Sequence, residues 1–81
     1  MIARVVVTPK AVVNDPQGLT VKQALGALGF AEVTAVRIGK HLILEVTAPS
    51  KEDAAARARA MCDRLLANPV TEDYSVLVEA A

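Results

Sequence analysis

Reactive and metal-binding side chains are scarce in this chain of 81 residues, which has one cysteine, one histidine and no tryptophan. A single cysteine, Cys62, can form neither an internal disulfide nor a two-cysteine metal site. It lies in an alanine-rich helical segment, where a thiol is typically a small buried hydrophobe. The lone His41 stands beside an expected turn with no committed partner. We therefore expect no catalytic residue, no metal site and no cofactor bound by this chain.

Net charge is also absent, because nine lysines and arginines balance nine aspartates and glutamates. Neutrality argues against phosphate neutralisation on a nucleic acid and against a polybasic membrane anchor. The aromatic residues are Phe30 and Tyr74 alone, too few for base stacking on a sheet. No apolar run approaches the ~18 residues of a spanning helix, and no signal-like segment opens the chain. We expect a cytoplasmic protein with no nucleic-acid or membrane partner.

Hydrophobic residues make up 53% of the chain, enough for one small domain over residues 1–81. Their spacing alternates or recurs at helical intervals in six segments. Asp15 with Pro16, and Ser50 with Asp53, are typical helix-start pairs. The expected strands are Ile2–Thr8, Val33–Ile38, His41–Thr47 and Tyr74–Glu79, and the expected helices are Pro16–Leu28 and Lys51–Ala67.

This order, βαββαβ, predicts an α+β fold of the ferredoxin-like type. Its sheet would have four antiparallel strands, with both helices on one face because the crossovers are right-handed. Gly39 and Lys40 would form the tight turn between the two middle strands. Asp53 would pair with Arg57 one helical turn later. The second helix would bury one apolar stripe against the sheet, Ala54, Ala58, Met61 and Leu65.

The sheet face without helices is expected to carry apolar residues among its charges. Alternation along the strands places Ile43 and Leu77 on this open face, while the first strand is apolar on both faces. We assign Val5 and Val7 to the open face as well. An exposed apolar cluster of this kind marks an interaction site. We therefore expect self-association, as a dimer or tetramer, through Val5, Val7, Ile43 and Leu77.

Three separated segments resemble the PurS family, the small subunit of bacterial phosphoribosylformylglycinamidine synthase. They are DPQG at Asp15–Gly18, VRIGK at Val36–Lys40 and MCDRLLANPVTEDYSV at Met61–Val76. The resemblance covers the whole chain in order. It implies a part in the fourth step of de novo purine synthesis. In that step formylglycinamide ribonucleotide, glutamine and ATP give formylglycinamidine ribonucleotide, glutamate, ADP and phosphate.

The resemblance also implies a bridging subunit that is part of an enzyme but has no catalytic centre of its own. The synthetase PurL would hold ATP and Mg²⁺, and the glutaminase PurQ would release ammonia. Some matched residues also have a local role: a helix cap explains Asp15 fully, Asn68 is chiefly a helix stop, and a core position suits Tyr74 equally well. The implied partner-binding residues are Asp15, Gln17, Gly18, Arg37, Gly39, Lys40, Asn68, Glu72, Asp73 and Tyr74.

A regulatory domain of the ACT type, which binds a small ligand at a dimer interface, is the alternative. It shares the βαββαβ order, and Lys10–Gly18 would form its ligand-binding loop. Amino-acid binding in a calorimeter would favour this alternative. A stable complex with the synthetase and the glutaminase would favour the PurS-like function.

Overall fold

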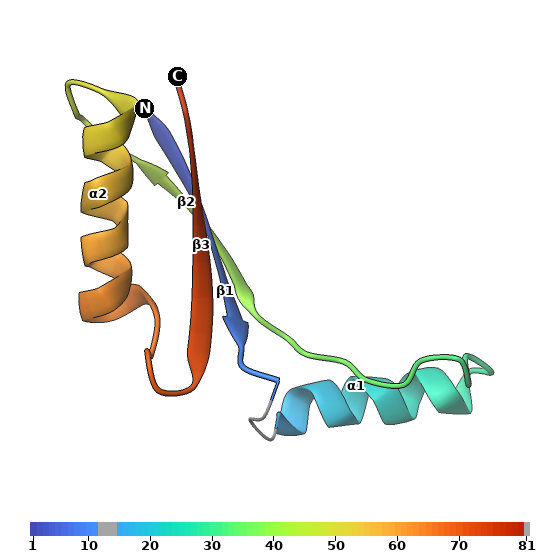
Figure 1. Ribbon diagram of the computed structural model, residues 1–81. Helices are drawn as coiled ribbons and strands as arrows, with labels where there is room; N and C mark the ends of the chain where they lie inside the picture. Colours follow the sequence, from blue (N-terminus) through green and yellow to red (C-terminus); the bar gives the residue numbers. More distant parts are fainter. Residues whose placement is uncertain (12–14, 81) are drawn as a thin grey trace.

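The computed structural model describes residues 1–11 and 15–80, so the middle of the expected Lys10–Gly18 loop lies outside the described residues. Both helices begin where the sequence predicts. The Asp15 carboxylate accepts a hydrogen bond from the Gly18 amide (3.1 Å), and the Ser50 hydroxyl accepts one from the Asp53 amide (3.1 Å). In chain order, the elements in Figure 1 are β1 (Ile2–Pro9), α1 (Pro16–Ala27), β2 (Lys40–Glu45), α2 (Lys51–Met61), the π-helical turn η1 (Cys62–Leu66) and β3 (Glu72–Glu79).

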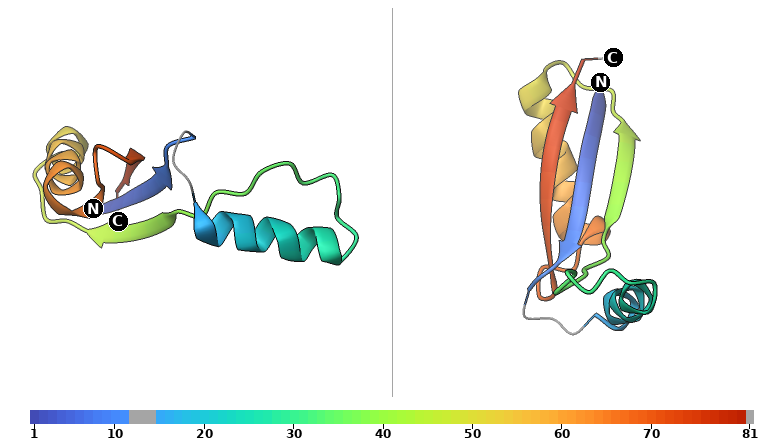
Figure 2. Two further views of the ribbon diagram at one scale, coloured as in Figure 1. Left: turned by 90° about the horizontal axis from the view of Figure 1, so that it is seen from below. Right: turned by 90° about the vertical axis from the view of Figure 1, so that its right-hand side faces the viewer.

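The three strands form an antiparallel sheet in the order β2-β1-β3, with α2 covering one face (Figure 2). In the centre of the sheet Val5 lies opposite Leu42 on one side and Val76 on the other. These side chains point toward α2 and share a period-2 pattern, as alternation requires. The core consists of Val5, Val7, Cys62 and Ala67, packed against Leu42, Leu44, Leu66, Tyr74 and Val76.

The expected fourth strand is wrong, because residues 33–39 form no strand and no hairpin. This segment runs back along α1, outside the sheet (Figures 1 and 2). The Ile38 amide, which a strand would use in a ladder, instead donates to the Asp15 carboxylate (2.9 Å). Gly39 is needed for a close approach and not for a turn, since a Cβ there would lie 2.1 Å from the Val7 carbonyl oxygen.

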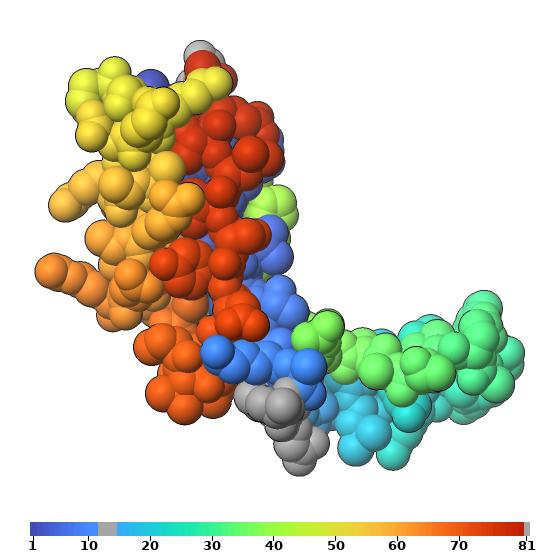
Figure 3. Space-filling view, viewed as in Figure 1, coloured from blue at the N-terminus to red at the C-terminus, as the bar shows by residue number. Residues whose placement is uncertain are grey.

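The first helix does not lie on the sheet, so the expectation of two helices on one face is also wrong. With the returning segment, α1 forms an arm, residues 15–39, that projects from the body of the molecule (Figure 3). Gly18 is the buried residue of α1, whereas Leu28, the last residue of the predicted helix Pro16–Leu28, is 74% exposed. The radius of gyration is 15.9 Å. A compact chain of this length would have about 12 Å. Apolar surface that a compact fold would cover is therefore open.

The second helix faces the sheet with a different stripe from the predicted one. Ala54 and Ala58 are buried as expected, and the small Cys62 follows them, whereas Met61 and Leu65 are 37% and 83% exposed. At Leu65 the cause is the wide turn η1, in which the Ala67 amide donates to the Cys62 carbonyl (3.0 Å). A π turn takes up one extra residue. It therefore brings Leu66, rather than its neighbour, into the core.

The open face of the sheet is confirmed for two of the four predicted residues. Ile43 and Leu77 are 58% and 61% exposed, and both lie opposite Arg4 in the strand register. Val5 and Val7, by contrast, are fully buried under α2, so their assignment to the open face is wrong. Their place there is taken by Val6, because β1 presents its other set of apolar residues to solvent.

Within the described part of the chain, no helix combines the length and the apolar character needed to cross a membrane.

Candidate partner-binding site at the junction of sheet and arm

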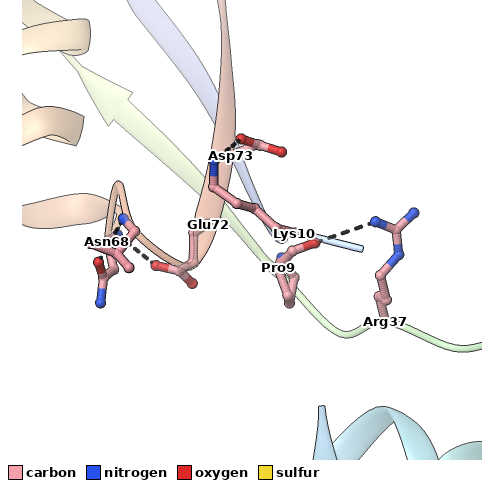
Figure 4. Close-up of polar contacts among 7 residues, drawn as sticks. Pro9, Lys10, Arg37, Asn68, Glu72 and Asp73 are labelled. Carbon is pink, nitrogen blue, oxygen red and sulfur yellow. Dashed lines mark hydrogen bonds and ion pairs between the residues drawn. The ribbon is translucent and has the colours of Figure 1, made fainter. Parts of the chain in front are cut away.

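The segments that carry the sequence resemblance converge at one end of the molecule. At this end β1 stops, β2 and β3 start, and the arm leaves the sheet (Figure 1). We call it the junction. Figure 4 shows that its polar contacts join residues from the end of β1, the arm and the turn before β3. The junction therefore brings together side chains that are far apart in the sequence.

On the arm side, Asp15 holds two pieces of backbone with one carboxylate. Its Oδ1 accepts from the Gly18 amide (3.1 Å) and its Oδ2 from the Ile38 amide (2.9 Å). Both bonds lower the pKa of Asp15 below its ordinary value, and the bond from Ile38 has the larger effect. Gly18 lies so close to the returning segment that a Cβ would stand 2.1 Å from the Val36 carbonyl oxygen. Both residues therefore join α1 to residues 36–38.

The same side contains a shallow depression of about 400 Å³, between the start of α1 and residues 34–37. Arg37 lines it, and its Nη1 donates to the Pro9 carbonyl (3.4 Å), which ties the arm to the end of β1 (Figure 4). Lys22 is the other cation on its wall. Gln17 in the first turn of α1 is exposed. The arm side thus presents the cations Lys22 and Arg37 and the Gln17 amide beside the hydrogen-bonded Asp15 carboxylate.

On the sheet side, Asn68 and Glu72 close the turn between η1 and β3. The Asn68 amide donates to the Glu72 carboxylate (2.8 Å), and the Glu72 amide donates to the Asn68 carbonyl (2.7 Å). The Asn68 side chain accepts from the Val70 amide (3.0 Å). This reciprocal pair sets the direction in which β3 enters the sheet.

Asp73 and Tyr74 follow this turn and contact residues that the sequence analysis missed. The Asp73 carboxylate pairs with Lys10 at 3.3 Å, and the Tyr74 hydroxyl donates to Asp63 at 3.0 Å. The bond to Asp63 raises the pKa of Tyr74, because it stabilises the neutral phenol. With Glu72 and Cys62 these side chains line a depression of about 260 Å³. Lys10 and Asp63 gave no signal in the sequence, because their partners lie in another element.

Lys40, at the start of β2, has a local role. Its ammonium donates to the Leu66 carbonyl (3.2 Å), at the end of the helical segment. A cation at that position satisfies a free carbonyl and interacts favourably with the helix dipole. Gly39 before it is the glycine that packs against β1. These two residues join β2 to the rest of the junction.

The chemistry available at the junction is ionic and hydrogen bonding. Burial, and to a lesser extent Asp63, raises the pKa of the Cys62 thiol, so this sulfur is protonated at neutral pH. Among residues 1–11 and 15–80, no three histidine, cysteine or acidic side chains are placed to hold a metal ion. The junction therefore offers a surface of charges and backbone groups.

A small α+β protein with a projecting arm and large exposed apolar side chains has the features of a binding module. The family model described as "PurS: Phosphoribosylformylglycinamidine (FGAM) synthase" matches residues 2–80. The chain belongs to this family. It is 42% identical over 77 residues to the phosphoribosylformylglycinamidine synthase subunit PurS of Synechocystis sp., with 95% of this chain and 77% of the relative covered.

Solved structures give the same family. The PurS of Methanocaldococcus jannaschii is similar to this chain with a TM-score of 0.85 and 35% sequence identity. The match covers 99% of this chain and 96% of the Methanocaldococcus jannaschii chain. A chain of the structure named PurLQS, from Thermotoga maritima, has a TM-score of 0.81 and 34% sequence identity. This match covers 95% of the present chain and 96% of the Thermotoga maritima chain. The arm and the three-stranded sheet therefore belong to a fold that solved PurS structures share.

Proposed function

We propose that this chain is the small, non-catalytic subunit of a glutamine-dependent phosphoribosylformylglycinamidine synthase. The observation that carries this function is the family match over residues 2–80. A solved structure with the same fold is named PurLQS, which supports PurL and PurQ as the partners. We assign ATP and Mg²⁺ to the synthetase, as the sequence resemblance implies, and place the complex in the cytoplasm.

The subunit acts by holding the synthetase and the glutaminase together. Ammonia released by a glutaminase is readily protonated and lost to solvent, so a docked complex favours its transfer to the second site. The junction has the properties of a docking end, since charges such as Arg37 and Asp73 remain exposed around a rigid set of backbone contacts. We place partner contacts at the ten matched residues, with Gln17 free to contact a partner and Asp15 and Gly18 shaping the surface.

The chain also associates with itself through the open face of the sheet. Val6, Ile43 and Leu77 form an exposed apolar group there, and Arg4 pairs with Glu79 at its side (2.9 Å). The arm exposes further large apolar residues, among them Leu19 and Phe30. A second copy would cover these surfaces, which supports a dimer or tetramer.

Co-purification tests the proposal directly. The chain is mixed with PurL and PurQ of the same organism, with and without glutamine and ADP, and separated by size-exclusion chromatography with light scattering. A complex containing all three proteins is the expected result. If the chain elutes alone under every condition, the proposed function is wrong. The ACT-type alternative has no support among the relatives described above.

A further inference from the structure

The outer side of α2 and η1 exposes an apolar surface that neither the sheet nor the arm covers. Met61 is 37% exposed and Leu65 83%, one helical turn apart. With Ala60 they form the floor of a depression of about 320 Å³, whose remaining lining residues are Arg57 and Arg64. We call these five residues the arginine-flanked patch. In Figure 3, α2 (yellow to orange) forms one edge of the molecule, away from the arm.

The packing of α2 explains why these residues face outward. The sheet takes the small side chains Ala54, Ala58 and Cys62, which lets the helix approach it closely. The wide turn then brings Leu66 into the core. Leu65 is therefore left on the outside, although its helical spacing from Ala58 suits a core position. Exposing so much of a leucine is unfavourable in water unless something covers it.

The charge around the patch is of one sign. Arg57 and Arg64 line it, and none of its lining residues is acidic. The predicted Asp53–Arg57 pair does not form, because Asp53 contacts the Ser50 hydroxyl (3.0 Å). Over residues 1–11 and 15–80, neither guanidinium has a carboxylate within 4.0 Å. The complement of such a surface is a segment that combines apolar and acidic side chains.

A second copy of the chain is a poor occupant. In a two-fold contact centred on the patch, the patch would meet itself and arginines would face arginines. The exposed helix α1 of another copy has no acidic residue between Pro16 and Ala27 to pair with them. The self-association proposed above uses the open face of the sheet, on the side away from α2, and so leaves the patch uncovered. The patch is therefore left available to a different protein, and we take such a protein as its occupant.

We propose that the arginine-flanked patch binds an acidic, apolar segment of another subunit of the synthase, an inference that rests on the proposed function. Leu65 would enter an apolar recess between the segment's side chains, and Arg57 and Arg64 would pair with its carboxylates. Self-association would use the open sheet face and the arm, so the two contacts are separable.

Two variants test the patch, Leu65→Ala and the double charge reversal Arg57→Glu/Arg64→Glu. Lys51→Glu is the control, because Lys51 lies on the same helix, is exposed and does not line the patch. Binding to purified PurL and to purified PurQ is measured by interferometry at two salt concentrations. Self-association is measured by sedimentation, and folding by circular dichroism.

For one of the two large subunits, we expect Leu65→Ala to weaken binding by about tenfold, as a central apolar contact does. The charge reversal should weaken the same binding by about a hundredfold or more, and Lys51→Glu should leave it unchanged. Self-association should be unchanged in all three variants. Wild-type affinity in both patch variants would overturn the inference, and so would a loss of self-association. If the wild-type chain binds neither large subunit, the proposed function itself fails.

Discussion

Replacing Leu77 by alanine removes the most exposed apolar side chain of the open sheet face without touching the core. Leu77 is 61% exposed and lies opposite Arg4 in the register, as Ile43 does on the other side. Full burial of a leucine is worth about 1.5–3 kcal/mol, so covering this exposed part is worth about 1–2 kcal/mol. Alanine keeps a fraction of that contact. We therefore expect a loss of about 1 kcal/mol from each copy.

A two-fold interface uses the residue twice, so the expected loss is about 2 kcal/mol, or roughly 30-fold in the dimer dissociation constant. Sedimentation equilibrium over a concentration series measures this constant. Val70→Ala is the matched control, because Val70 is 79% exposed in the turn before β3 and lies off the sheet face. An unchanged dissociation constant in the Leu77 variant would refute the assignment of the interface.

Three further measurements test the local structure. Gly18→Ala should lower the midpoint of thermal unfolding because its Cβ would meet a carbonyl oxygen at 2.1 Å, whereas Gly26→Ala, with open space around its Cβ, should raise stability by up to about 1 kcal/mol. The lowered pKa of Asp15 means that its carboxylate contributes stability above its ordinary pKa of 3.8, and this contribution is lost as pH falls through the lowered value. The free energies of unfolding of wild type and Asp15→Asn, measured in urea, should therefore differ at neutral pH and converge in acid. A difference that stays constant with pH would contradict the role of the hydrogen bonds to the Asp15 carboxylate. The midpoint of the ultraviolet titration of Tyr74 should lie above pH 10.0 and should fall in Asp63→Asn. Identical titration curves for wild type and Asp63→Asn would show that the hydrogen bond is absent.

Local signals predicted most of the secondary structure. The helix starts at Asp15 and Ser50 depend on side chains that bond their own first turn, so a short stretch of sequence contains the whole cause. The alternation of β2 and β3 likewise identified Ile43 and Leu77 as open-face residues. These features need no knowledge of the rest of the chain.

The errors concern partners that are distant in the sequence. Residues 33–38 are rich in β-branched side chains, yet a strand also needs a neighbour, and the Ile38 amide bonds to Asp15 instead. Val5 and Val7 could not be separated from Val6 by pattern, since β1 is apolar on both faces. At Leu65 the prediction failed because one wide turn changes which residue of the pair 65–66 faces the core.

The candidate site was predicted in part for the same reason. The matched segments meet at one end of the molecule, but Lys10 and Asp63, which contact Asp73 and Tyr74 there, had no local signal as contact residues. The structure also gives local roles to Gly18, Gly39 and Lys40, which hold α1, β1 and η1 in place. In the proposed function, their effect on a partner would therefore be through the shape of the junction.

The ratio of glutamine-driven to ammonium-driven turnover in the reconstituted synthase tests most directly whether this chain joins two active sites. PurL and PurQ are assayed at fixed concentration with and without the chain, once with glutamine and once with an ammonium salt. We predict that omitting the chain abolishes the glutamine-driven rate and leaves the ammonium-driven rate of PurL unchanged. A glutamine-driven rate that does not depend on the chain would contradict the account.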